Sequence, residues 1–279
     1  MTSGRVAVVG DVGGHLEDLV DELARLGADP ATGRLPPDLT VIQVGDLVHR
    51  GPQSERVVAL VDGYLRDQPD QWVQLVGNHE AQYLGEPLFE WPERLDPEAQ
   101  ATLRRWWSTG LMRVAASVVT ARGSFLVTHA GLTTGFWRDV LDQPGDVREA
   151  EQLLNALAGR EDVAVFRPGQ MLTGQRRTRA AGPVWAAAST ELVPGWVDRP
   201  MPFSQVHGHS SLYDWQQRRF RVSAGLVRVT TLDEEAKHET TTLEGGRIIG
   251  VDPAHGVRPR RPWRAWEVRL DDGSAAAGG

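Results

Sequence analysis

The chain contains no cysteine, which excludes disulfide bonds and thiolate metal sites, so any metal must be held by oxygen and nitrogen ligands. It has no apolar run near the roughly 18 residues that a membrane-spanning helix needs, and no apolar leader before the first strand we predict, at Arg5. We therefore expect a soluble cytoplasmic protein without a membrane partner.

Basic residues are outnumbered: 30 Lys and Arg stand against 37 Asp and Glu, which gives a net charge of -7. A general nucleic-acid-binding role would need a basic face to neutralise phosphates, so this balance argues against nucleic acid as a partner. With 279 residues, 41% of them hydrophobic, the chain can bury one large core without needing a second domain. We predict a single domain over residues 1–270 and a disordered polar tail over 271–279.

The first third of the chain alternates strand-like and helix-like patterns, which is typical of parallel βαβ units. The predicted strands cover 5–10, 40–45 and 72–76, and the predicted helices cover 15–26 and 54–66. A further helix over 97–107 has Asp96 as its N-cap and Pro97 at its first position.

The rest of the chain is predicted to contain a hairpin, two insertions and a set of strands at short spacing. Residues 114–120 and 124–128 are rich in β-branched residues and flank a short turn. The insertions, at about 86–113 and 133–202 with a helix near 146–159, would form walls beside the strand ends. The closing strands, mostly antiparallel, cover 203–207, 218–223, 226–232, 239–243 and 247–251.

Five predicted strands end in side chains that bind metals: Asp11, Asp46, Asn78, His129 and His209. Open α/β sheets bind their ligands at such carboxyl ends. Oxygen donors mixed with imidazole suit Mn, Fe, Zn or Ni better than Ca. Two divalent ions roughly 3.5–4 Å apart could hold a phosphate and activate a water, with the two oxygens of Asp46 as the bridge. His79 could then protonate the leaving oxygen, and the planar guanidinium of Arg50 suits a phosphate.

Five sequence blocks resemble the calcineurin-like metallophosphoesterases in order and spacing. They are Gly-Asp-Val at 10–12, Gly-Asp-Leu-Val-His-Arg-Gly at 45–51, Gly-Asn-His-Glu at 77–80, His-Ala-Gly-Leu at 129–132 and Gly-His-Ser at 208–210. The chain looks most like the serine/threonine protein phosphatase branch and its bacterial relatives, including diadenosine tetraphosphatases.

The resemblance implies an α/β fold, a four-layer α/β/β/α sandwich of two mixed sheets with helical insertions. It implies two divalent metal ions, with Mn favoured, and it assigns Asp11, Asp46, Asn78, His129 and His209 as ligands. It also implies His79 as the acid and Arg50 as a phosphate clamp.

Three positions depart from the family pattern. Gly13 stands where a ligand histidine is usual, and His49 stands where an aspartate orients the acid histidine. A neighbouring imidazole cannot stabilise an imidazolium as a carboxylate does. Ala187 stands where a second phosphate-binding arginine is usual, and Arg177, or its neighbours Arg176 and Arg179, could bind the substrate instead.

Simpler interpretations remain beside these. His207 is more simply a packing or hydrogen-bonding residue, and His15 is either a polar residue at a helix start or a replacement ligand. The Trp pairs 106/107 and 263/266 are most simply packing residues.

We predict a metallophosphoesterase that hydrolyses phosphomonoesters by attack of a metal-activated water, with a phosphoprotein as the first substrate hypothesis. A dinucleoside polyphosphate hydrolase, with a nucleotide substrate, is the alternative within the enzymes. The competing class is a catalytically weakened metal- or phosphate-binding protein, because Gly13, His49 and Ala187 each remove a part of the family's machinery.

Overall fold

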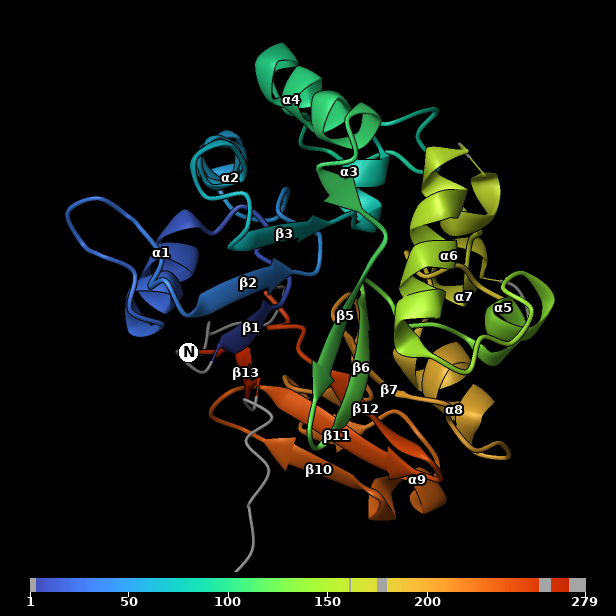
Figure 1. Ribbon diagram of the computed structural model, residues 1–279. Helices are drawn as coiled ribbons and strands as arrows, with labels where there is room; N and C mark the ends of the chain where they lie inside the picture. Colours follow the sequence, from blue (N-terminus) through green and yellow to red (C-terminus); the bar gives the residue numbers. More distant parts are fainter. Residues whose placement is uncertain (1–3, 161, 175–179, 256–261, 271–279) are drawn as a thin grey trace, which may run out of the picture.

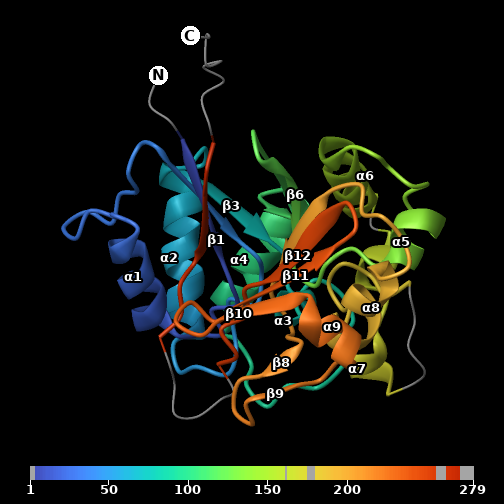
Figure 2. The same cartoon turned by 90° about the horizontal axis from the view of Figure 1, so that it is seen from below.

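The computed structural model describes residues 4–160, 162–174, 180–255 and 262–270. Two large mixed sheets lie face to face, and helices cover their outer faces (Figure 1). In the perpendicular view, α1 and α2 lie on one side of the sheets and α5, α6 and α8 on the other (Figure 2). The predicted α/β fold with two mixed sheets is confirmed.

The first sheet has the strand order β13-β1-β2-β3-β4. Its strands are β1 (Arg5–Val9), β2 (Leu39–Gln43), β3 (Trp72–Leu75), β4 (Met112–Arg113) and β13 (Trp266–Arg269). The strands β1 to β4 run parallel, and β13 joins β1 antiparallel. The accompanying helices are α1 (Leu16–Arg25), α2 (Ser54–Asp67), α3 (Asn78–Ala81) and α4 (Pro97–Ser108).

The second sheet has the order β10-β11-β12-β7-β6-β5. Its strands are β5 (Ala115–Thr120), β6 (Gly123–Thr128), β7 (Ser204–His207), β10 (Thr230–Asp233), β11 (His238–Leu243) and β12 (Gly246–Gly250). Here β6, β7 and β12 run parallel, and the other pairs are antiparallel. The helical segments of this half are α5 (Thr134–Asp139), α6 (Val147–Gly159), η1 (Val163–Phe166), α7 (Gln170–Thr173), η2 (Ala188–Leu192), α8 (Val193–Trp196) and α9 (Ala224–Arg228).

Alternate side chains of each strand pack into different layers, as the two-residue period of a strand requires. On β1, Val6 and Val8 pack between the sheets with Val127 and Val206 of the opposite sheet. Ala7 and Val9 point to the other face and join the apolar core beneath the helices. The strands are thus buried on both faces, which fixes where their carboxyl ends lie.

Several local predictions are confirmed. The β5–β6 hairpin pairs Ala115 with Thr128 and Thr120 with Gly123. Asp96 caps α4 by accepting a hydrogen bond from the N–H of Ala99 at 2.8 Å, and Pro97 opens the helix.

The strands predicted over 218–223 and 226–232 are partly wrong. Residues 224–228 form α9, and β10 begins only at Thr230. Of the earlier segment, β9 (Arg219–Phe220) is a two-residue strand paired with β8 (Tyr213–Asp214). The strand β13 has no counterpart in the prediction.

The predicted tail over 271–279 lies outside the described residues. Within the described part of the chain, no helix combines the length and apolar character that crossing a membrane requires.

Candidate metal centre

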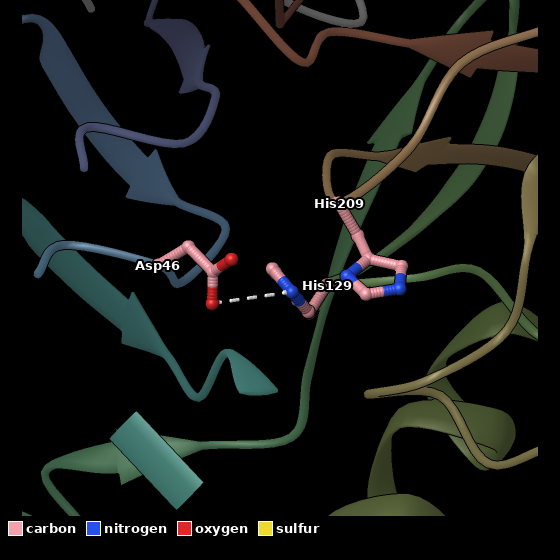
Figure 3. A group of neighbouring side chains, drawn as sticks. All are labelled: Asp46, His129 and His209. Carbon is pink, nitrogen blue, oxygen red and sulfur yellow. Dashed lines mark ion pairs between the residues drawn. The ribbon is translucent and has the colours of Figure 1, made fainter. Parts of the chain in front are cut away.

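The five side chains predicted as ligands follow the carboxyl ends of five strands drawn from both sheets. Asp11, Asp46 and Asn78 come after β1, β2 and β3 of the first sheet. His129 and His209 come after β6 and β7 of the second sheet. Figure 3 shows Asp46 facing the two imidazoles across the space between the sheets.

The polar atoms of this group are close together. The Oδ1 atom of Asn78 lies 2.8 Å from Nδ1 of His209 and 3.0 Å from Nε2 of His129. The same Nε2 lies 3.4 Å from Oδ1 of Asp46. Ligating atoms of Asp46, His129 and His209 all lie within 4.8 Å of one another, so a single cation could contact all three.

Asp11 joins the group through the backbone, because its Oδ1 accepts a hydrogen bond from the N–H of His209 at 3.0 Å. Among the described residues, Oδ2 of Asp11, Oδ2 of Asp46 and Nε2 of His209 are buried without a hydrogen-bond partner. Burying polar atoms unpaired is costly, and a cation bound between them would remove that cost. The donor set therefore fits divalent cations of the oxygen- and imidazole-binding class.

The charge states also suit a cation. Burial lowers the pKa of both His129 and His209, so each imidazole is neutral and offers a lone pair. Burial opposes ionisation of Asp46, but His79, His129 and Arg50 outweigh it and lower the pKa of this carboxyl. Burial and the charges of Asp252 and Asp46 raise the pKa of Asp11 well above its usual range. A bound cation would oppose that rise.

The loop that carries Asp46 is held in an uncommon backbone conformation, with φ of +54° at Asp46 and +105° at Gly45. The buried carboxylate of Glu80 accepts hydrogen bonds from the N–H groups of Asp46 at 2.7 Å, Leu47 at 2.8 Å and Gly77 at 2.9 Å. No sequence pattern predicted a role for Glu80. Its only signal was an acidic residue directly after a buried strand end.

The position of the first departure, Gly13, has a left-handed backbone, with φ of +54°. A Cβ atom there would lie 3.4 Å from the carbonyl oxygen of His49 and 3.5 Å from the ring of His255. The ring of His255 hydrogen-bonds through Nε2 to the carbonyl oxygen of Asp11 at 2.9 Å and lies 4.4 Å from that of His15. Within the described ranges, the three residues whose ligating atoms lie within 4.8 Å of one another are Asp46, His129 and His209, and they include neither His15 nor Asp11.

The structure describes only one of the arginines predicted to bind phosphate, Arg50. The side chain of Arg50 is exposed and lines a pocket of about 220 Å³ together with His209, Ser210 and Asp252. Arg177, like Arg176 and Arg179, lies outside the described residues. The buried His207 donates from Nδ1 to the carbonyl oxygen of Gly208 at 2.8 Å, which fits the simpler interpretation of this residue.

The predicted acid, His79, lies beside the ligand group, with its Nε2 3.8 Å from Oδ2 of Asp46. Its backbone N–H donates to Oδ1 of Asp46 at 2.9 Å. The second departure, His49, contacts the other ring nitrogen of His79, Nδ1, at 2.6 Å. Burial lowers the pKa of both histidines to about 4.

Aromatic side chains from both predicted insertions border the site. Phe89 belongs to the first insertion and Trp185 to the second, and their ring centroids are 5.6 Å apart. The ring of Phe89 is 5.9 Å from that of His79, and the ring of Trp185 is 6.1 Å from that of His209. The insertions therefore meet at the ligand group.

The family model of the calcineurin-like phosphoesterases matches residues 4–227, a span that contains all five ligand candidates. The chain belongs to the calcineurin-like phosphoesterase family. This confirms the resemblance seen in the sequence. The family uses divalent metals, in agreement with the cluster of Asp46, His129 and His209.

Two curated relatives resemble parts of the chain. A zinc-dependent endopolyphosphatase of Saccharomyces cerevisiae is 32% identical over 90 residues, which are 31% of this chain and 25% of that protein. The serine/threonine-protein phosphatase C23G10.1 of Caenorhabditis elegans is 32% identical over 140 residues, 47% of this chain and 27% of that protein. The chain thus spans about a quarter of the length of these curated relatives.

The fold is shared more widely. A cold-active protein tyrosine phosphatase superposes with a TM-score of 0.55 at 16% identity, covering 96% of this chain and 74% of that one.

Proposed function

We propose that the protein is a metal-dependent phosphoesterase that hydrolyses phosphomonoesters. The observation that carries the proposal is the cluster of Asp46, His129 and His209, whose ligating atoms lie within 4.8 Å of one another, together with buried polar atoms of Asp11, Asp46 and His209 that lack hydrogen-bond partners among the described residues. When bound, divalent ions would neutralise charge on the phosphate and lower the pKa of a water to near neutrality. Asp46, Asn78, His129 and His209 would hold one ion, and Asp46 and Asp11 a second.

The protein's own residues would position the ester and stabilise its charge. Arg50, exposed beside the ligand group, would bind the phosphate oxygens. Water forms the new bond to phosphorus and releases a proton to solvent. The bond to the leaving oxygen breaks with its electron pair, and that oxygen takes a proton from His79, which solvent then restores.

A phosphoprotein is the substrate that we favour, because one relative is a serine/threonine-protein phosphatase. The aromatic side chains of Phe89 and Trp185 beside the site could contact the residues around a phosphorylated side chain. We also propose a cytoplasmic location and a single-domain organisation. Manganese is the metal that we favour.

The proposal is tested with the purified protein, manganese and para-nitrophenyl phosphate. We expect turnover that falls by at least about a hundredfold in Asp46→Asn, because a carboxylate that would hold the cations is lost. Metal analysis returning about two ions per chain would agree with it. One ion per chain and no turnover with manganese would contradict it, and would favour a binding protein weakened at Gly13, His49 and Ala187. Parallel assays with phosphopeptides and diadenosine polyphosphates then decide the substrate class.

A further inference from the structure

His79 is linked to two further buried side chains, and one of them, His49, stands where the family pattern has an aspartate. Its Nδ1 lies 2.6 Å from Nδ1 of His49, and Nε2 of His49 lies 2.7 Å from the hydroxyl of Tyr83. The same hydroxyl accepts a hydrogen bond from the N–H of Leu95 at 3.1 Å. The three side chains thus form a continuous chain of hydrogen bonds that ends on the backbone.

The three hydrogen-bonded side chains are also buried from solvent. His79 is 2% exposed, His49 1% and Tyr83 6%, so water does not compete for these hydrogen bonds. The ring of Trp91 stacks on His49 with centroids 5.5 Å apart and meets His79 edge-on at 4.6 Å. Both imidazoles are therefore fixed in rotation as well as in position.

The backbone at His49 has an uncommon conformation that a histidine can adopt. Its φ is +72°, a left-handed conformation in which histidine, asparagine and aspartate are several-fold enriched among residues other than glycine. Its N–H donates to the hydroxyl of Ser54 at 2.9 Å, which ties the loop to the start of α2.

We propose that His49 and Tyr83 are positioning residues for His79, in place of the carboxylate that the sequence lacks. His49 occupies Nδ1 of His79, and Tyr83 in turn holds His49, so that Nε2 of His79 stays turned toward the ligand group, 3.8 Å from Oδ2 of Asp46. The contact between His49 and His79 needs one proton between the two nitrogens, and the hydroxyl of Tyr83 can donate to His49 or accept from it. The same heavy-atom geometry therefore serves His79 before and after it gives up its Nε2 proton.

The inference rests on the proposed function, because it assigns a partner to the acid of that reaction. Its signature is a dependence on the leaving group. Phenol has a pKa of about 10, like the side chain of tyrosine, so phenolate is a poorer leaving group than para-nitrophenolate and depends more on a proton from the acid. Misplacing the acid should therefore slow phenyl phosphate more than para-nitrophenyl phosphate.

The test compares kcat for both esters in the full-length, manganese-loaded protein. We expect Tyr83→Phe and His49→Gly to lower kcat for phenyl phosphate by about tenfold more than for para-nitrophenyl phosphate. Glycine suits the left-handed backbone at position 49, and His49→Asp, which also suits it, should restore the rate for phenyl phosphate by offering an oxygen to Nδ1. The cavity of about 380 Å³ that His49 lines should also let added imidazole rescue His49→Gly.

Tyr64→Phe is the matched control, because Tyr64 is also 6% exposed and its hydroxyl donates to the carbonyl oxygen of Gly33 at 2.8 Å, a hydrogen bond that involves neither His79 nor His49. It should leave the ratio of the two rates unchanged. The inference would be overturned if Tyr83→Phe and His49→Gly lowered kcat equally for both esters, or for neither, while His79→Asn still slowed phenyl phosphate more than para-nitrophenyl phosphate. If the wild type turned over neither ester, the proposed function would fail instead. If His79→Asn slowed both esters equally, the role of His79 as the acid would fail, and the inference with it, while the hydrolysis itself stood.

Discussion

At the residue scale, the site depends on close contacts between backbone segments that only glycine permits. Gly45 has φ of +105°, and a Cβ atom there would overlap the backbone nitrogen of Gly77. This contact brings the loop after β2 against the loop after β3, and so places Asp46 beside Asn78. Positions of this kind tolerate no side chain, because the obstacle is backbone and cannot move aside.

Two glycine substitutions should therefore change stability in opposite directions. Gly45→Ala should lower the free energy of unfolding by more than about 3 kcal/mol, through overlap and backbone strain. Gly63→Ala, within α2 and with no heavy atom within 4 Å of the added Cβ, should raise it by about 0.5–1 kcal/mol. Urea denaturation followed by circular dichroism measures both. A tolerated Gly45→Ala would show that the two loops are not packed as described.

The position of the five candidate ligands after strand ends could be predicted, whereas the surroundings of His79 could not. Gly-Asp and Gly-Asn pairs after apolar runs mark strand ends, and strands that run parallel bring such ends together. The contact between His49 and Tyr83 has no such signal, because it depends on the path of the chain after α3. The same limit applies to Glu80, whose hydrogen-bond partners lie on two different loops.

At the element scale, Glu239 on β11 holds the segment that follows His209. Its carboxylate is 2% exposed and accepts hydrogen bonds from the N–H groups of Leu212 at 2.7 Å and Tyr213 at 2.9 Å. Burial raises the pKa of Glu239 from its usual value of 4.5 to about 7. The folded protein therefore binds a proton that the unfolded chain releases at lower pH.

The stability that this proton confers is fully present below about pH 4.5 and is lost as the pH rises through 7. We expect the free energy of unfolding, relative to that of Glu239→Gln, to fall by about 1 kcal/mol per pH unit between pH 5 and 7 and then to level off. Denaturant titrations at several pH values measure this difference. Glu234→Gln, which removes an exposed partner of Arg218, is the control and should show no such slope. A constant difference for Glu239→Gln would contradict the account.

The helices and strands were predicted best where the apolar pattern of a segment agrees with its burial in the fold. The strands β1, β2 and β3 are apolar runs that end up buried, and α1 and α2 have the spacing of amphipathic helices. The segment Ala224-Gly-Leu-Val-Arg228 is too short for its period to separate helix from strand, and it forms α9. The strand β13 was missed because its partner, β1, lies at the opposite end of the chain.

At the scale of the whole molecule, the ligand group joins two sheets that otherwise meet through apolar side chains. Asp11, Asp46 and Asn78 come from one sheet, and His129 and His209 from the other. A cation bound by the folded protein alone would stabilise it by mass action, in addition to any catalytic role. The central claim is therefore that a divalent cation is held at Asp46 between the two sheets.

The most direct test of this claim is the metal content of the purified full-length protein, measured by elemental analysis after dialysis against manganese and gel filtration. We predict that the wild type and Asp67→Asn, a change at a carboxylate that is 58% exposed and pairs with Arg66, retain the metal. We predict that Asp46→Asn retains only background levels. Equal metal content in Asp46→Asn and the wild type would contradict the account.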